Sequence, residues 1–173
     1  MRISKPAAMP ALSWRAALVA LRSFVGIVYL TNGLAKLIGF SHFSVGPWSQ
    51  YLINRSDAQG ILASNVHNPG LGIGPFRDLA NNLVLAHWDV FGWLVTAGEL
   101  TVGLALILGV FGRLAALGGF AMAFLLFIWS FGAGGWTYDY LFEPVLLAIL
   151  MFTPGLPGLG SVLQQRRIAP APP

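Results

Sequence analysis

The chain has 173 residues, 56% of them hydrophobic and 9% charged, with a mean hydropathy of +0.71 and a net charge of +4. Because a soluble domain has about 25% charged residues, this composition excludes an ordinary soluble enzyme and predicts a polytopic membrane protein. The absence of cysteine excludes disulfides, Cys-ligated zinc or iron–sulfur clusters and thiol nucleophiles within the chain. The basic residues stand at the ends of apolar segments, so we expect no nucleic-acid partner.

Residues 1–15 carry Arg2, Lys5 and Arg15 without an acid, and we expect them to form a cytoplasmic tail. The apolar run 16–38 is long enough to cross a bilayer at about 20 residues per span. A signal peptide is the alternative, but the run is too long and lacks a small-x-small cleavage site. Small and polar residues recur along one face of this segment: Arg22, Gly26, Tyr29, Asn32, Gly33 and Lys36. This pattern is typical either of a helix-packing face or of a functional site.

The long connection at about 40–87 is rich in glycine, proline, asparagine and aromatic residues, and we interpret it as an outer loop that caps the bundle or binds a partner. Pro75 is placed to begin a helix. Apolar residues then follow at helical spacing, which predicts an interfacial amphipathic helix: Phe76, Leu79, Leu83 and Val90. The three histidines of the chain are too far apart to form a local metal motif, and we predict no metal site.

Three further spans are predicted at 88–110, 114–131 and 140–152, joined by short turns. Ala115, Gly119 and Ala123 form a small-residue stripe suited to helix contact. The fold class is therefore all-α: a four-helix transmembrane bundle over 16–157, with a second cytoplasmic tail at 158–173. The distribution of Lys and Arg predicts a multi-pass protein of the bacterial or archaeal cytoplasmic (inner) membrane, with both termini cytoplasmic.

Acids and bases inside these spans require partners or a purpose. From estimated depths we predict an inner cluster of Glu99 with Arg22 and Tyr29, and an outer cluster of Lys36 with Glu143, Asp139 and Asp89. Such clusters suit proton-coupled chemistry, and the catalytic candidates are Glu99, Arg22, Lys36 and Glu143. The candidates to hold a flat ring are Tyr29, Asn32, Trp88, Trp93 and Trp136. The alternative is that these pairs only fix the register of the helices.

The motifs Asn32-Gly33-Leu34-Ala35-Lys36 and Gly98-Glu99-Leu100-x-x-Gly103, with Arg113 and an acid in the last helix, resemble the DoxX/DoxD family of small four-helix membrane proteins. The resemblance covers 22–157, and the long outer loop is more similar to the DoxD branch. It implies a membrane subunit of a thiosulfate:quinone oxidoreductase, working beside a second subunit called DoxA. Lys36, Glu99, Arg113 and Glu143 match the polar positions of the family.

The resemblance thus implies quinone as the cofactor, with membrane lipids and other membrane or extracytoplasmic subunits as partners. We do not expect the chain to catalyse alone, since it has no cysteine and no evident redox-metal motif. Two other functions stay open. One is a non-catalytic accessory subunit of a larger respiratory or photosynthetic complex, and the other is a lipid or small-solute handling protein.

Overall fold

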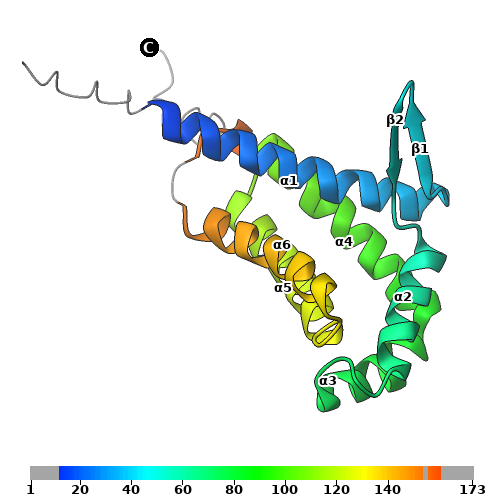
Figure 1. Ribbon diagram of the computed structural model, residues 1–173. Helices are drawn as coiled ribbons and strands as arrows, with labels where there is room; N and C mark the ends of the chain where they lie inside the picture. Colours follow the sequence, from blue (N-terminus) through cyan, green and yellow to red (C-terminus); the bar gives the residue numbers. More distant parts are fainter. Residues whose placement is uncertain (1–11, 154–155, 161–173) are drawn as a thin grey trace, which may run out of the picture.

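The computed structural model describes residues 12–153 and 156–160, apart from the side chains of residues 12, 13, 48, 50 and 135–138. Its long helices are α1 (Leu12–Ile38), α4 (Trp88–Leu108), α5 (Gly112–Trp129) and α6 (Gly135–Phe152). They form two pairs, α1 with α4 and α5 with α6, which are drawn side by side in Figure 1. Contacts of α4 with α5 and of α1 with α6 join the pairs.

Glycines allow the α1–α4 pair to pack with its backbones in contact. A Cβ added at Gly103 would lie 2.5 Å from the backbone nitrogen of Leu30, and one added at Gly33 would lie 2.9 Å from that of Leu100. No side chain fits at such distances, so these glycines bring the two helix axes close together.

The α5–α6 pair is built on the small-residue stripe expected from the sequence. Ala115, Gly119 and Ala123 are all buried. A Cβ added at Gly119 would come within 3.1 Å of the side chain of Leu147, which is itself fully buried. Ala115 and Ala123 belong to an apolar core that also includes Leu106 of α4.

The outer segment between α1 and α4 is more structured than the predicted loop. It contains a hairpin of β1 (His42–Val45) and β2 (Trp48–Tyr51), then α2 (Arg55–His67), α3 (Gly74–Leu79) and the π-helix η1 (Ala80–Leu85). The strands are antiparallel, with His42 opposite Tyr51 and Val45 opposite Trp48. The structure is mostly helical, as predicted, and the hairpin and the helix α2 are elements that the sequence did not predict.

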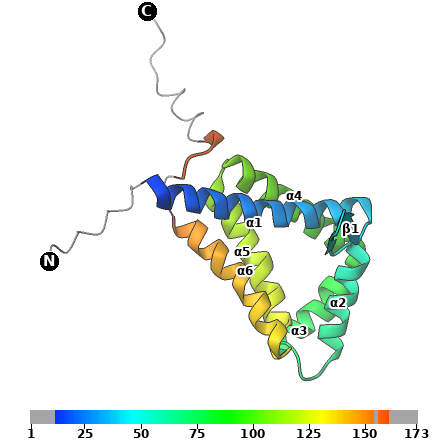
Figure 2. The same ribbon diagram turned by 45° about the horizontal axis from the view of Figure 1, so that its top comes forward.

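The outer segment connects the far ends of the two helix pairs. The backbone N–H of Gly72 donates to the carbonyl oxygen of Phe131 at 2.7 Å, and the indole Nε1 of Trp129 donates to that of Phe76 at 3.0 Å. Its own small core consists of Leu62, Val66, Ala80 and Val84. In Figure 2 the two pairs and the outer segment form three sides of a triangle.

The predicted amphipathic helix corresponds to α3 and η1. Its predicted apolar stripe is exposed, while Ala80 and Val84 face the core of the outer segment. The members of that stripe are Phe76, Leu79, Leu83 and Val90, which already belongs to α4, and between 37% and 53% of each is exposed.

Three helices in the described part of the chain are long and apolar enough to cross a membrane: Trp14–Ile38, Trp88–Leu108 and Gly112–Trp129. Large apolar side chains such as Phe24, Leu104 and Leu117 are exposed along them, which a protein in water rarely tolerates. The fold therefore fits a multi-pass membrane protein. The helix α6, which was expected as a fourth span, is not among these three.

The ends of the chain differ from the expected tails. Helix α1 begins at Leu12, inside the predicted tail 1–15. The described residues of the second tail, 158–160, fold back onto Gly109, where the N–H of Gly160 donates to its carbonyl at 3.4 Å. Residues 1–11 and 161–173 lie outside the described residues.

Candidate functional site

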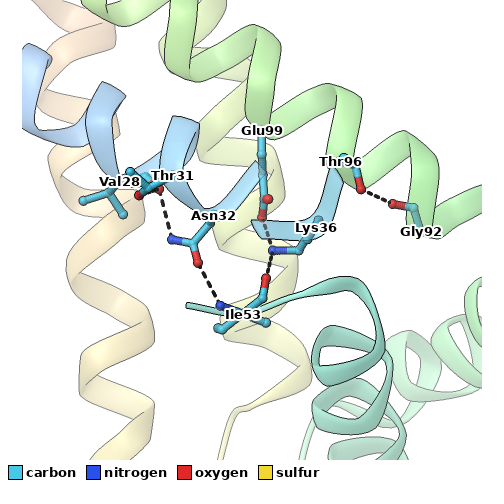
Figure 3. Close-up of polar contacts among 8 residues, drawn as sticks. All are labelled: Val28, Thr31, Asn32, Lys36, Ile53, Gly92, Thr96 and Glu99. Carbon is cyan, nitrogen blue, oxygen red and sulfur yellow. Dashed lines mark hydrogen bonds and ion pairs between the residues drawn. The ribbon is translucent and has the colours of Figure 1, made fainter. Parts of the chain in front are cut away.

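A buried ion pair joins α1 to α4. The Nζ of Lys36 lies 2.9 Å from Oε1 of Glu99, and the two side chains are 4% and 15% exposed (Figure 3). Taking both charges out of water is costly, and a single uncompensated charge at this place would cost more. The pair therefore either fixes the packing of the helices or serves a function.

Ile53, which lies between β2 and α2, contacts the same place through its backbone. Its carbonyl oxygen accepts a hydrogen bond from Nζ of Lys36 at 3.0 Å, and its N–H donates to Oδ1 of Asn32 at 3.2 Å (Figure 3). The amide nitrogen of Asn32 donates in turn to the carbonyl of Val28 at 3.0 Å. Two predicted site residues thus hold the outer segment against α1.

Glu99 and Lys36 each retain hydrogen-bonding capacity. The Oε2 of Glu99 is buried and has no hydrogen-bond partner among the described residues. The ammonium group of Lys36 has three protons, and among the described residues it contacts Oε1 of Glu99 and the carbonyl oxygen of Ile53. An acceptor and a donor of opposite charge therefore lie side by side.

Tyr29 and Glu143 complete this group, which we call the Lys36–Glu99 cluster (Tyr29, Asn32, Lys36, Ile53, Glu99 and Glu143). The carboxylate of Glu143, on α6, is close enough to interact electrostatically with Lys36, Glu99 and the hydroxyl of Tyr29. The hydroxyl of Tyr29 donates to the carbonyl of Gly119 on α5 at 2.9 Å. The cluster thus touches all four long helices.

The two clusters predicted from depth are wrong in their membership. Glu99 pairs with Lys36, not with Arg22, which lies beside Gly109 at the other end of α4. Asp89 and Asp139 are exposed, and the ion pair found among the described residues includes neither. One cluster replaces the two that we expected.

Two of the predicted ring-binding tryptophans, Trp88 and Trp93, have contacts of another kind. Trp93 is half exposed and lies under the guanidinium of Arg55, whose Cζ is 4.1 Å from the ring centroid. Trp88 packs against the core of the outer segment, and the side chain of Trp136 is not among those described. The roles of these residues in ring binding stay predictions.

Sequence reasoning missed Ile53. Its part in the cluster comes from its backbone carbonyl and N–H, which any residue would supply. No pattern of side chains distinguishes it within the outer segment.

The polar residues that the structure brings together lie mostly within one family match. The DoxX family model matches residues 17–133, about two thirds of the chain. The chain belongs to the DoxX family. No curated protein and no solved structure matches it. The match runs from α1 to α5 and includes Lys36, Ile53 and Glu99, while Glu143 on α6 lies beyond it.

Proposed function

We propose that this DoxX protein is a membrane subunit that binds a quinone at the Lys36–Glu99 cluster and takes part in quinone-linked electron transfer. The observation that carries the proposal is the buried Oε2 of Glu99, which has no hydrogen-bond partner among the described residues. A buried carboxylate oxygen left in that state is costly, and a ligand hydroxyl would remove the cost.

The chemistry of the cluster fits both oxidation states of such a ligand. Oε2 of Glu99 accepts a hydrogen bond from a quinol hydroxyl. The ammonium group of Lys36 donates a hydrogen bond to a quinone carbonyl oxygen. A charged donor and a charged acceptor make stronger hydrogen bonds than neutral groups. The site therefore favours rings whose oxygen atoms either donate a hydrogen bond, as in a quinol, or accept one, as in a quinone.

A quinone takes up electrons and protons in equal number when it is reduced to a quinol. In our proposal the residues of the chain handle the protons: Glu99 holds one at its carboxylate, and Glu143 exchanges with it across the cluster. Lys36 keeps the carboxylate of Glu99 oriented. We assign the electrons to a partner subunit, because the chain has no cysteine to carry sulfur or bind an iron–sulfur cluster.

Thiosulfate is the electron donor to test first, because the resemblance to the DoxD branch implies it. The membrane arrangement that we propose has α6 as a fourth span and both termini in the cytoplasm. Arg15 and Arg113 at one end of the bundle support that orientation, because Lys and Arg are enriched on the cytoplasmic side.

Binding of a short-chain quinol to the purified protein in lipid nanodiscs tests the proposal. We expect Glu99→Gln to weaken binding by about 10–100-fold, because a hydrogen bond to a charged group contributes about 1.5–3 kcal/mol. Asp89→Asn is the matched control: it neutralises an exposed acid on the same helix and should leave binding unchanged. Equal affinity of the wild type and Glu99→Gln, or no binding to either, would reject the quinone site.

A purely structural role is the second candidate, and the contacts of Ile53 favour it. Lys36 and Asn32 both form hydrogen bonds with the backbone of that residue, so the cluster also links the outer segment to α1. In membranes that contain the partner subunits, this role predicts that Glu99→Gln lowers the yield of the assembled complex while quinone reduction per complex stays normal. The quinone role predicts that quinone reduction per assembled complex is lost, whatever the yield of the complex.

A further inference from the structure

Arg22 is a buried cation far from the ion pair of Lys36 with Glu99. Arg22 is 6% exposed, and the Nε of its guanidinium has no hydrogen-bond partner among the described residues. Lys36 lies fourteen positions further along α1, about 21 Å away at about 1.5 Å per residue. Arg22 therefore requires an explanation of its own.

No acidic side chain among the described residues pairs with Arg22. It has six acidic residues, all of them among those the structure describes: Asp57, Asp78, Asp89, Glu99, Asp139 and Glu143. The ion pair found among the described residues is Lys36–Glu99. A buried guanidinium without a carboxylate partner is costly inside a membrane protein, so an anion from outside the chain would stabilise it.

The place where Arg22 lies is shaped by glycine. Its guanidinium packs against Gly109, the left-handed residue (φ 67°) that ends α4, and a Cβ added there would lie 2.8 Å from Nη2. The Cα of Gly158 lies 2.8 Å from that same Cβ position. Only glycine at 109 leaves both the required backbone angle and the space for the guanidinium.

The position along the bundle indicates which anion is available. The turn beside Arg22 separates two apolar helices suited to cross the membrane, Trp88–Leu108 and Gly112–Trp129, so it lies where spans end and lipid headgroups begin. Phe111 and Leu114 at this turn are 75% and 66% exposed, which suits contact with acyl chains. Arg113 adds a second, exposed positive charge.

We propose that Arg22 binds the phosphate group of an anionic phospholipid whose headgroup lies at the α4–α5 turn. Phosphate matches the planar fork of a guanidinium, and basic pockets between transmembrane helices bind anionic headgroups. Inorganic phosphate shares this chemistry. The exposed apolar residues at the turn favour the lipid as its source. This site is independent of the quinone proposal.

Native mass spectrometry of the delipidated protein in detergent tests the proposal, with added phosphatidylglycerol, phosphatidylcholine or inorganic phosphate. We expect phosphatidylglycerol to be retained preferentially, and Arg22→Ala to lower its affinity by about 10–100-fold. Arg22→Lys keeps the charge but loses the planar guanidinium fork. Its affinity for phosphatidylglycerol should lie between those of the wild type and Arg22→Ala. Arg113→Ala, which removes an exposed charge from the same turn, is the matched control and should change affinity far less.

Several outcomes would overturn this site. Equal losses in Arg22→Ala and Arg113→Ala would mean general attraction to basic residues, and equal binding of inorganic phosphate and phosphatidylglycerol would mean a free anion as ligand. If Arg22→Ala does not fold, the wild type still decides: phosphatidylglycerol should raise its unfolding temperature more than phosphatidylcholine does. No such difference would reject the proposal.

Discussion

Each partner of the Lys36–Glu99 pair depends on the other, because either one alone is an uncompensated charge between α1 and α4. We expect Lys36→Met or Glu99→Gln alone to lower the free energy of unfolding by about 3–5 kcal/mol. The double variant should recover much of this loss, since no charge is then left unpaired. Unfolding of the four proteins in mixed detergent gives the coupling energy. Additive losses would show that the pair is not coupled.

A second residue-scale prediction concerns the hairpin. The hydroxyl of Tyr51 donates to Oδ2 of Asp57 at 3.0 Å, and this bond raises the pKa of Tyr51 above its ordinary value because it stabilises the protonated phenol beside a negative charge. The contribution of this bond to stability is complete below the unfolded-state pKa of tyrosine. It is lost as the pH rises through the higher folded-state value.

Absorbance of ionised tyrosine during an alkaline titration measures this pKa. We expect Asp57→Asn to move one of the four tyrosines to a lower pKa than in the wild type. Tyr51→Phe serves as the control and identifies the titrating residue, because its curve should lack that component. A titration identical in the wild type and Asp57→Asn would contradict the assigned bond.

At the scale of elements, the sequence identified the helices that carry the charges but not their register. The predicted depths place the outer ends of α1 and α4 at one level. In the structure Gly33 packs against Leu100 and Gly26 against Ile107, so α1 ends beside the middle turns of α4. The first turns of α4 extend past α1 to α2, where Gly92 meets Arg55. This offset brings Lys36, rather than Arg22, to Glu99.

The glycine contacts that set this register yield a testable consequence. We expect Gly103→Ala to lower the free energy of unfolding by about 1–3 kcal/mol, because its Cβ would overlap the backbone of Leu30. Gly60→Ala in α2 is the control, since nothing lies within 4 Å of its Cβ position. That variant should be neutral or more stable by about 0.5–1 kcal/mol. Equal effects of the two substitutions would show that the α1–α4 contact is looser than described.

At the scale of the whole molecule, composition was enough to predict a helical membrane protein but not the outer segment. The stripes of small residues can be predicted from the spacing of neighbouring residues in the sequence. Helix α2 and the hairpin instead depend on contacts with residues far away in the sequence. One example is the amide nitrogen of Asn65, which donates to the hydroxyl of Ser130 on the far pair at 2.9 Å. Helix α2 has little amphipathic pattern of its own and buries only Leu62 and Val66. Tertiary contacts, which a single sequence does not display, therefore decide this part of the fold.

The number of spans is the property of the whole molecule that an experiment settles most directly. Because the chain has no cysteine, single cysteines placed in it can be labelled without background by a membrane-impermeant maleimide on intact cells. His67, Arg113 and Leu159 are exposed and lie in the outer segment, at the α4–α5 turn and after α6. With four spans and cytoplasmic termini, His67→Cys should react from outside, and Arg113→Cys and Leu159→Cys only after permeabilisation. If Leu159→Cys reacted from outside while Arg113→Cys did not, α6 would not cross the membrane. Glu143 would then be near the outer surface, where a carboxylate needs no partner, and its assigned part in proton exchange would fail with it.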